Sequence, residues 1–373
     1  MKVLFLSVTA GQGHNQTAKA AMAYLQQQDV ECTMLDTYEY INSIISESIA
    51  RGYLISTKFT PAAYGRLYRL AEKREKSNAK FSISKLTNAI LSRKLINYIN
   101  DYKPDVIVGT HIFSAQIITH MVQRCKINCM TIGIITDYTI HPFWEDTDLD
   151  YYITANEQLN LQMMKKGIPV EKVKPFGIPI HMKFAQKIVA LEAREQLGIE
   201  DKTTICMMGG SMGYVNVIPL IKKIDALDLD FQMICVCGSN KKLKEKIDSL
   251  ANKIKKKIYN YGFIDNVDVI LDASNLIITK PGGLTVSESL AKQTPMIMIN
   301  PIPGQEDRNV EFLLNNGLAM HITKTFSIDE AIFQLLGNEW RQHNMQQVIK
   351  HIGRPYAAKD LGDFIIEMVN GKK

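Results

Sequence analysis

The sequence has few cysteines, no metal-type cysteine pattern and no apolar run long enough to span a membrane. Its 373 residues include six cysteines, none of them in a CxxC pair,. Cys206, Cys235 and Cys237 lie in apolar runs, which favours buried, reduced thiols,. No stretch approaches the roughly 20 apolar residues of a membrane helix, and the run Val3–Val8 is too short for a signal peptide,. We therefore expect a cytoplasmic protein that contacts membranes only peripherally.

Charge is unevenly distributed along the chain. The formal net charge is only +6. Residues 51–103, however, contain twelve Lys and Arg against three acidic residues, so this segment carries about +9 and the rest of the chain about −3,. A basic zone of this kind indicates an anionic partner, either anionic lipid or nucleic acid. No nucleic-acid-binding motif is present, so we expect no nucleic-acid partner,.

Short apolar runs alternate with amphipathic stretches in both halves of the chain, which predicts parallel βαβ units in tandem. The expected strands are Val3–Val8, Val30–Leu35, Val106–Gly109, Cys129–Thr136, Tyr151–Ala155, Val173–Phe176, Thr204–Met208, Phe231–Cys237, Ile258–Tyr261, Leu276–Thr279 and Met296–Ile299. The main expected helices are Asn15–Gln27, Ser114–Arg124, Gln158–Lys166, Phe184–Leu197, Asn216–Ile224, Lys241–Lys257, Thr285–Lys292, Asn309–Asn315 and Lys359–Val369. The pattern predicts two doubly wound α/β domains.

Proline and glycine punctuation at residues 177–180 places the domain boundary. We expect an N-terminal domain over residues 1–180, a second domain over 181–355, and a C-terminal helix within 356–373 that crosses back to the first domain,. Segment 37–103 interrupts the alternation with aromatic and basic residues. We interpret it as an insertion, and insertions of this size on a rigid scaffold usually carry function. The alternative is a solvated helical decoration.

Two glycine-rich turns follow the first expected strand of each domain. Residues 9–14 read Thr-Ala-Gly-Gln-Gly-His, and residues 209–213 read Gly-Gly-Ser-Met-Gly. Free N–H groups at the start of a helix bind anions, and glycine lets a ligand approach the backbone. His14 has an ordinary pKa near neutrality and is a candidate general base; the alternative is that it only caps or packs. Ser211 adds a hydroxyl to the second turn.

The most specific pattern covers residues 275–309. Lys280-Pro281-Gly282-Gly283-Leu284-Thr285 follows an expected strand and opens a helix that contains Glu288. Such a helix start is suited to a diphosphate, and a carboxylate one turn further on is suited to the two hydroxyls of a ribose. Pro303-Gly304-Gln305-Glu306 follows the next strand and presents an amide beside a carboxylate, which suits a polyhydroxylated sugar.

Taken together, these motifs resemble the GT-B glycosyltransferase family that includes monogalactosyldiacylglycerol synthases and processive diacylglycerol glucosyltransferases. The resemblance covers essentially the whole chain. The motifs that carry it are Thr9–His14, Thr136-Asp137-Tyr138 with His141-Pro142, Gly177-Ile178-Pro179, Gly209–Gly213, Lys280–Glu288 and Pro303–Glu306 with Asn309-Val310. It implies two Rossmann-like domains facing a cleft, a UDP-glucose or UDP-galactose donor, a diacylglycerol acceptor and inversion at the sugar. It implies a hexosyltransferase attached peripherally to the inner face of the cell membrane.

The resemblance also implies roles for individual residues. His14 or Asp137 is the candidate base, and His141 lines the acceptor side. The residues expected around the donor are Gly13, Gly210, Ser211, Phe263, Gly283, Thr285, Glu288, Gln305 and Glu306. The residues expected at the membrane are Arg66, Arg69, Lys73 and Arg74. No DxD motif occurs in a plausible donor loop, so we expect no metal and no other cofactor, with helix N-termini holding the diphosphate instead.

Two departures from the family pattern leave alternatives open. The opening turn has fewer glycines than the family usually shows, and the Gly-Ser-Met-Gly turn at 210–213 is closer to the peptidoglycan N-acetylglucosaminyltransferase. A transferase with a polyprenyl-linked acceptor and a UDP-sugar epimerase on the same scaffold therefore remain alternatives. A nucleotide-sugar-binding regulator without turnover is a further one.

Overall fold

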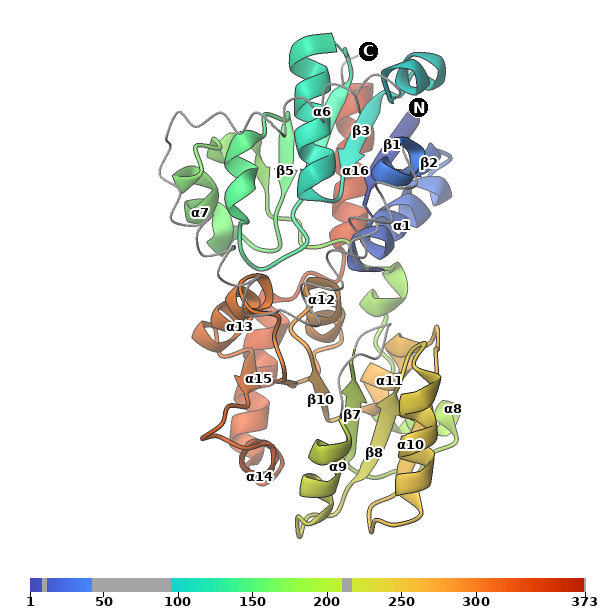
Figure 1. Cartoon of the computed structure of the whole chain (residues 1–373), viewed down its shortest axis with the longest axis vertical. Helices are drawn as coiled ribbons and strands as arrows, with labels where there is room; N and C mark the ends of the chain where they lie inside the picture. The colour runs from blue at the N-terminus through green and yellow to red at the C-terminus, as the bar shows by residue number, and fades with distance from the viewer. Residues whose placement is uncertain (9–11, 42–94, 126, 210–216, 372–373) are drawn as a thin grey trace. The chain divides into compact units, whose positions relative to one another are not determined.

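The computed structural model describes residues 1–8, 12–41, 95–125, 127–209 and 217–371, which form two compact units (Figure 1). Unit 1 comprises Met1–Met182, Ile302–Gln305 and Tyr356–Lys373, and unit 2 comprises Lys183–Pro301 and Glu306–Pro355. The boundary at 182/183 lies two residues beyond the expected one. The expected second domain also differs by one short loop, because residues 302–305 belong to unit 1.

Unit 1 is built on a parallel sheet with the strand order β2-β1-β3-β4-β5-β6. Its strands are β1 (Lys2–Ser7), β2 (Glu31–Asp36), β3 (Val106–Gly109), β4 (Met130–Ile134), β5 (Tyr151–Ile153) and β6 (Val173–Lys174). Its helices are α1 (Gln12–Gln27), α2 (Thr37–Ile41), α6 (Ile112–Cys125), α7 (Asn160–Lys165) and α16 (Ala357–Asn370), with short 3-10 turns η1 (Pro142–Asp146), η2 (Glu157–Leu159) and η3 (Val170–Lys172). The strand order changes direction between β1 and β3, which is where ligands bind in such sheets.

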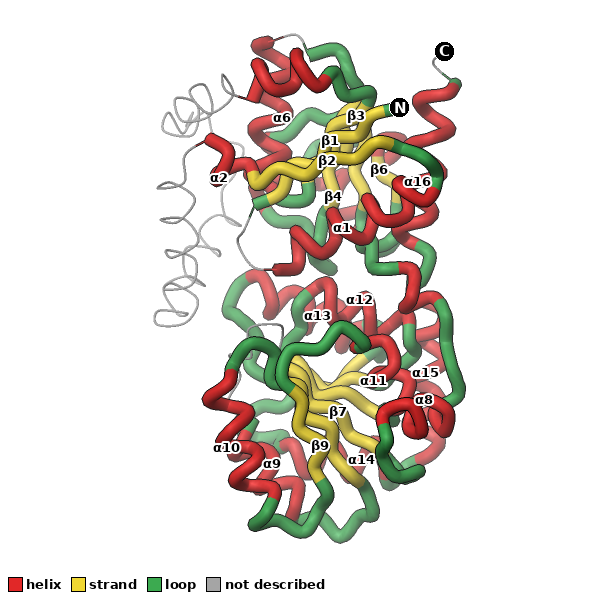
Figure 2. Tube along the Cα trace, turned by 90° about the vertical axis from the view of Figure 1, so that its right-hand side faces the viewer, coloured by secondary structure: helices red, strands yellow, loops and turns green. Residues whose placement is uncertain are grey.

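Helices cover both faces of the unit 1 sheet (Figure 2). Right-handed crossovers leave β1 and β3 in opposite directions along the sheet, so α1 and α6 lie on opposite faces. Helix α16 joins α1, and together they bury one apolar face of the sheet. The cluster includes Val3, Phe5, Ala18, Ala21, Leu25, Val106, Val108, Ile132, Ile134, Ile153, Leu361, Ile365 and Val369. The C-terminal helix therefore completes the core of unit 1, with Tyr24 Oη donating to Asp363 Oδ1 at 2.6 Å.

Unit 2 contains a second parallel sheet, ordered β12-β11-β10-β7-β8-β9. Its strands are β7 (Thr204–Met208), β8 (Gln232–Val236), β9 (Ile258–Tyr261), β10 (Leu276–Thr279), β11 (Met296–Met298) and β12 (Ala319–His321). Its helical segments are η4 (Met182–Ala185), which begins at the boundary, α8 (Ala190–Leu197), α9 (Ile218–Asp225), α10 (Lys241–Ala251), α11 (Val267–Ala273), α12 (Gly283–Ala291), α13 (Gln305–Asn315), α14 (Ile328–Leu336) and α15 (Glu339–Ile352). Here the switch point lies between β7 and β10. The prediction of two doubly wound α/β domains is confirmed.

The single helix predicted over Phe184–Leu197 is wrong, because the chain leaves the helical conformation between η4 and α8. Lys292 and Asp272 form a buried ion pair at 2.6 Å. Lys292 Nζ also donates to the carbonyl oxygen of Gln186, and Asp272 Oδ2 accepts from the backbone N–H of Ile188 at 3.3 Å. These tertiary bonds hold the intervening residues in an extended loop against α11 and α12.

The helix predicted over Lys241–Lys257 is too long, since α10 ends at Ala251. The carboxylate of Asp225, at the end of α9, accepts the backbone N–H groups of Lys255 and Lys256, each at 2.9 Å. These donors are used in a turn and are therefore not available for a continuing helix.

No described helix is long and apolar enough to cross a membrane.

Candidate functional site

Three polar segments meet at the carboxyl ends of β1, β3 and β4 in unit 1. His14 lies in the first turn of α1, directly after the loop that follows β1. Thr110 and His111 follow β3, and Thr136 and Asp137 follow β4. These strands are neighbours in the sheet, so their carboxyl ends bring the side chains together at the switch point,.

The hydrogen bonds of His14 fix the position of its ring proton. Nδ1 lies 2.8 Å from the carbonyl oxygen of Thr110, and the hydroxyl of Thr136 lies 3.0 Å from the same nitrogen. Because a carbonyl oxygen can only accept, Nδ1 must carry the proton in the neutral ring. Nε2 then keeps its lone pair, and no described residue occupies it with a hydrogen bond. The geometry therefore presents an imidazole whose Nε2 is ready to accept a proton.

The surroundings keep His14 largely unprotonated. Burial lowers the pKa of His14 below its usual value, and the charge of Asp137 and the bond to Thr110 raise it only in part,. A neutral imidazole at physiological pH is the form that a general base requires.

Asp137 is not hydrogen-bonded to His14. Its Oδ2 accepts a hydrogen bond from Nε2 of Gln305 at 2.6 Å, within unit 1. Asp137 therefore acts on His14 through its charge, and it also orients Gln305. The structure brings together three residues that the sequence predicted separately.

Two His-x-Phe segments flank His14, and they share one capping arrangement. Nδ1 of His111 accepts the backbone N–H of Phe113 at 3.1 Å at the start of α6. Nδ1 of His141 likewise accepts the N–H of Phe143 at 3.2 Å at the start of η1. His141 was predicted on the acceptor side, whereas His111 was missed because a lone histidine after a strand carries no sequence signal.

His111 packs edge-to-face on His14, with ring centroids 4.5 Å apart and planes at 82°. The pKa of His111 is held well below its usual value, first by burial and then by the neighbouring His14 and His141,. His111 is therefore neutral.

In unit 2, Glu288 projects from α12 into a partly buried site beside Lys183 and Asp268. Burial raises the pKa of Glu288 to about 8, with Lys183 lowering it and Asp268 raising it further. Lys183 Nζ lies 3.0 Å from Asp268 Oδ1 and donates to the carbonyl oxygen of Asp265. Sequence reasoning missed this ion pair because its two members are far apart in the chain.

The turn between β10 and α12 leaves space around its first glycine. A Cβ atom at Gly282, the N-cap of α12, would meet no atom of the described residues within 4 Å, and Gly283 is the first residue of the helix. Asn309, fully buried on α13, donates to the carbonyl oxygen of Pro281 at 2.9 Å. Because α12 begins at Gly283, Thr285 is its third residue, and its backbone N–H is among those without an intrahelical acceptor,.

The structure also describes three other residues that were predicted to bind the donor. Glu306 lies 3.1 Å from Lys280 Nζ in a largely buried ion pair. Phe263, in the turn after β9, is 71% exposed, so its ring is accessible to a ligand. A side chain at Gly13, in the first turn of α1, would also meet no atom within 4 Å.

Several predicted residues lie outside the part of the chain that the structure describes. These are Arg66, Arg69, Lys73, Arg74, Gly210 and Ser211, with most of the 37–103 insertion and residues 9–11 of the opening turn. Within the described ranges, no group of three or more His, Cys, Asp or Glu side chains is arranged to hold a metal ion.

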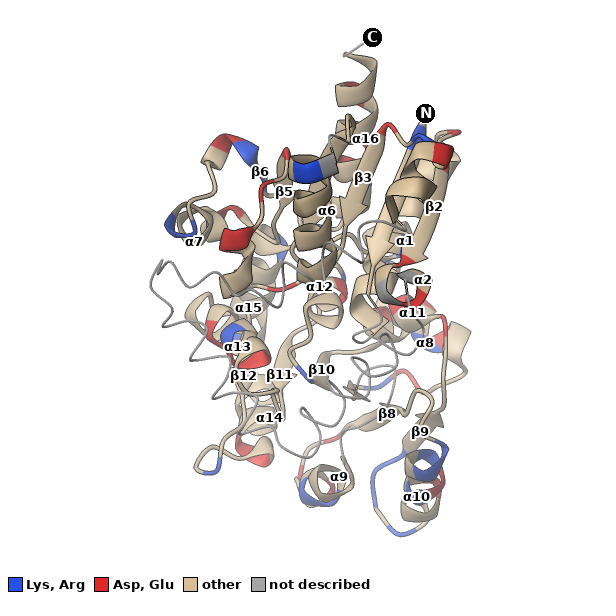
Figure 3. Ribbon diagram, turned by 45° about the horizontal axis from the view of Figure 1, so that its top comes forward, with Lys and Arg blue, Asp and Glu red and all other residues tan. Residues whose placement is uncertain are grey.

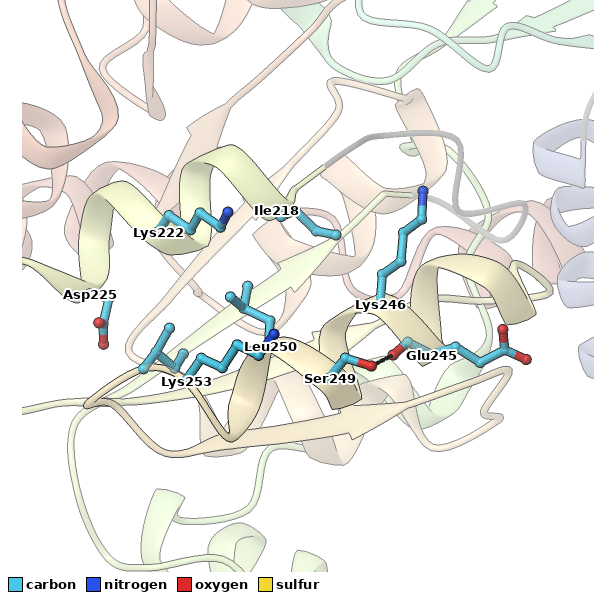
Figure 4. A pocket seen from close by; sticks show the side chains of 9 residues that line it. Ile218, Lys222, Asp225, Glu245, Lys246, Ser249, Leu250 and Lys253 are labelled. Atoms are coloured by element: carbon cyan, nitrogen blue, oxygen red, sulfur yellow. Dashed lines mark hydrogen bonds between the residues drawn. The ribbon is translucent and has the colours of Figure 1, made fainter.

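A groove of about 640 Å³ lies between α9 and α10 (Figure 4). Lys222, Lys246 and Lys253 line it together with Asp225 and Glu245. Lys and Arg residues are frequent on α9, on α10 and in the loop that follows α10 (Figure 3). None of its lining residues was predicted as a site residue, and none carries one of the family motifs. We therefore do not place the chemistry there.

Comparison with known proteins assigns both halves of the chain. Residues 14–180 match the monogalactosyldiacylglycerol (MGDG) synthase family, and residues 204–357 match the C-terminal domain of glycosyltransferase family 28. The processive diacylglycerol beta-glucosyltransferase of Bacillus pumilus is 27% identical over 369 residues, covering 98% of this chain and 94% of that protein. The Bacillus subtilis protein of the same name is 27% identical over 358 residues, covering 94% and 91%.

Solved structures share the fold. MurG of Acinetobacter baumannii superposes with a TM-score of 0.66 at 17% identity, covering 98% of this chain and 99% of that one. Anabaena HepE in complex with UDP-glucose superposes with a TM-score of 0.56 at 11% identity over the full length of both chains. The UDP-GlcNAc 2-epimerase of Neisseria meningitidis gives a TM-score of 0.59 at 13% identity, covering 98% and 100%. The GT-B fold class is thereby confirmed.

Proposed function

The chain belongs to the glycosyltransferase family of monogalactosyldiacylglycerol synthases and processive diacylglycerol glucosyltransferases, and on this premise we propose that it transfers glucose or galactose from a UDP-sugar to diacylglycerol. The similarity to the Bacillus enzymes extends over nearly the whole of both chains, and this is the observation that carries the acceptor assignment.

Unit 2 binds the donor in this proposal. The open start of α12 receives the diphosphate through free N–H groups and the partial positive charge of the helix, with Gly283 and Thr285 nearest to it,. Glu288 binds the ribose hydroxyls, and the exposed ring of Phe263 lies against the uracil. Gly210 and Ser211 complete the diphosphate site, and Gln305 and Glu306 orient the sugar.

Unit 1 supplies the base. The acceptor hydroxyl transfers its proton to Nε2 of His14, while its oxygen forms a bond to the anomeric carbon from the side opposite UDP. The bond between that carbon and the diphosphate oxygen breaks, and UDP leaves with the electron pair. The product is inverted at the anomeric carbon. We favour His14 over Asp137 because its neutral imidazole keeps a lone pair on Nε2, whereas an aspartate has an ordinary pKa near 4 and is a weaker base at neutral pH.

The leaving diphosphate is stabilised by helix N-termini and not by a metal ion. The lack of a DxD motif in a plausible donor loop and the space at the helix start after β10 support this part of the proposal,. The enzyme is peripheral to the inner face of the membrane, held by the basic segment 51–103 with Arg66, Arg69, Lys73 and Arg74,.

The test is incubation of the protein with vesicles that contain diacylglycerol, in separate reactions with UDP-glucose and UDP-galactose. Mass analysis of the lipids should show addition of one or more hexoses, and nuclear magnetic resonance of the product should show an inverted anomeric centre. Absence of any glycosylated lipid with either donor would rule out the proposal.

Two parallel reactions separate the alternatives. A polyprenyl-linked acceptor replaces diacylglycerol in the first, because the Gly-Ser-Met-Gly turn at 210–213 resembles that of the peptidoglycan N-acetylglucosaminyltransferase. The UDP-sugar is incubated without acceptor in the second, and a new epimer would favour the epimerase reading suggested by the Neisseria structure.

A further inference from the structure

His111 and His14 present opposite tautomers side by side. His14 carries its proton on Nδ1, which is bonded to the Thr110 carbonyl, so its Nε2 is an acceptor,. His111 accepts the Phe113 N–H at Nδ1, so in its neutral form the proton must be on Nε2,. One ring therefore offers a lone pair and the other a hydrogen-bond donor.

Neither of these Nε2 atoms has a hydrogen-bond partner among the described residues, although both rings are partly buried. The other ring nitrogen, Nδ1, is bonded to the backbone in both residues: to the Thr110 carbonyl oxygen in His14 and to the Phe113 N–H in His111. An unused donor and an unused acceptor, held by rings whose centroids lie 4.5 Å apart, fit a ligand that carries a hydroxyl and a carbonyl oxygen a few ångströms apart,.

Diacylglycerol has this chemistry, because its single hydroxyl is followed along the glycerol by ester carbonyls. We propose that His111 is a specificity-determining residue that donates its Nε2–H to an ester carbonyl oxygen of the acceptor lipid, while His14 receives the proton of the hydroxyl. The inference rests on the proposed function and adds to it how the acceptor is oriented.

Because its imidazole is uncharged, His111 is better suited to donate a hydrogen bond to a carbonyl oxygen than to a phosphate. A neutral imidazole N–H makes an ordinary hydrogen bond to an uncharged oxygen, whereas anions are bound mainly by charged donors. Burial and the two neighbouring histidines keep His111 uncharged, so it does not compete with His14 for the reacting proton.

The test compares two acceptors in the same vesicles, diacylglycerol and the dialkylglycerol of the same chain length, whose ether links lack the carbonyl oxygens. The wild-type protein should glycosylate the ester lipid with a kcat/KM about tenfold higher, the expected size for one neutral hydrogen bond to a buried donor. The variant His111→Phe keeps an aromatic ring against His14 but has no N–H, and its ester-to-ether ratio should fall to about 1.

A second variant controls for loss of the helix cap that His111 provides at the start of α6. His111→Asn retains a side chain that caps α6 but is too short to place a donor where the imidazole Nε2 lies, so it should also lose the preference. His343→Phe, at an exposed position on α15, is the control and should keep the wild-type ratio. The ratio is measured on one enzyme sample, so a general loss of active protein cancels.

The outcomes separate the inference from the function on which it rests. Glycosylation of neither lipid by the wild-type protein would refute the proposed acceptor class. Glycosylation of both lipids with equal efficiency, or an ester preference that survives in His111→Phe, would overturn the role of His111 and leave the transferase assignment intact.

Discussion

At the residue scale, the hydrogen bonds of His14 and Asp137 distinguish two candidates that the sequence left equal. The family resemblance implied that both lie near the acceptor, but only the fold shows that Nδ1 of His14 is bound to the Thr110 carbonyl and that Asp137 accepts from Gln305. These contacts join residues more than 90 positions apart in the chain, so the local sequence does not contain them.

If His14 is the base, His14→Ala should lower kcat by on the order of 10²-fold or more, with donor binding nearly unchanged.

Asp137→Asn keeps an oxygen for Gln305 but removes the charge that raises the pKa of His14. That pKa should fall further, so the acid limb of the kcat/KM profile should move to lower pH. A steady-state pH series measures both effects.

The opposite pattern would assign the base to Asp137. In that case Asp137→Asn would abolish turnover, and the acid limb would persist in His14→Ala.

Glu288 provides a second residue-scale prediction, because its pKa of about 8 means that the free protein holds it mostly protonated at neutral pH. A carboxylate that accepts both ribose hydroxyls favours the ionised form, so UDP binding should release a proton near pH 7. The affinity for UDP should therefore rise between pH 6 and pH 8. Titration calorimetry in two buffers with different ionisation enthalpies measures the released proton.

Glu288→Gln is the matched variant, since it retains size and hydrogen-bonding capacity without a titrating group. We expect its affinity to be about tenfold or more lower and independent of pH over this range. Equal proton release in the wild type and the variant would show that another group titrates.

At the scale of elements, the order of strands and helices was largely predictable, whereas their ends were not. Apolar runs identified the strands up to β11, because the inner strands are buried on both faces of a sheet,. The edge strands β2 and β9 were also identified, although they are only partly buried. The edge strand β12 was not predicted. Helix α14 was also missed, although Ile328, Ala331, Ile332 and Leu335 are buried with helical spacing,.

The predicted helix ends are wrong where hydrogen bonds to distant residues determine where a helix stops. The loop between η4 and α8 depends on the Lys292–Asp272 pair, and the end of α10 depends on Asp225. Each of these partners lies 30 residues or more away in the chain, so local sequence does not contain the information.

The packing of α16 on α1 permits a test of how tightly the C-terminal helix is fitted. A Cβ atom at Gly362 would lie 2.4 Å from Cδ1 of Tyr24. Gly362→Ala should therefore destabilise unit 1 by about 1–3 kcal/mol, despite the better helix propensity of alanine. Chemical denaturation followed by circular dichroism measures the change.

The control is the same substitution in a Tyr24→Leu background, where the ring is absent. The additional cost of Gly362→Ala should then largely disappear, because the methyl group has space. An equal cost in both backgrounds would mean that the contact with Tyr24 does not limit the approach of the two helices.

At the scale of the whole molecule, the distribution of charge separates two explanations of the membrane attachment that we propose. The basic segment 51–103 carries about +9, and α9 and α10 line a second basic region with Lys222, Lys246 and Lys253. Attraction to an anionic surface is worth about 1 kcal/mol for each well-placed Lys or Arg and weakens as salt rises. A general effect of net charge and a specific effect of the basic segment therefore make different predictions for variants with the same total charge.

Two triple variants make this comparison. Changing Arg69, Lys73 and Arg74 to Ala removes three charges from the basic segment, and changing Lys222, Lys246 and Lys253 to Ala removes three from the α9–α10 groove. Sedimentation with vesicles of increasing anionic lipid content should show weakened binding by roughly 100-fold for the first variant at low salt. The second should bind like the wild type, and all three proteins should converge at high salt. If both variants lose the same affinity, attachment follows net charge and the basic segment has no special role; if neither does, the aromatic residues of the segment, and not its charge, must provide the contact.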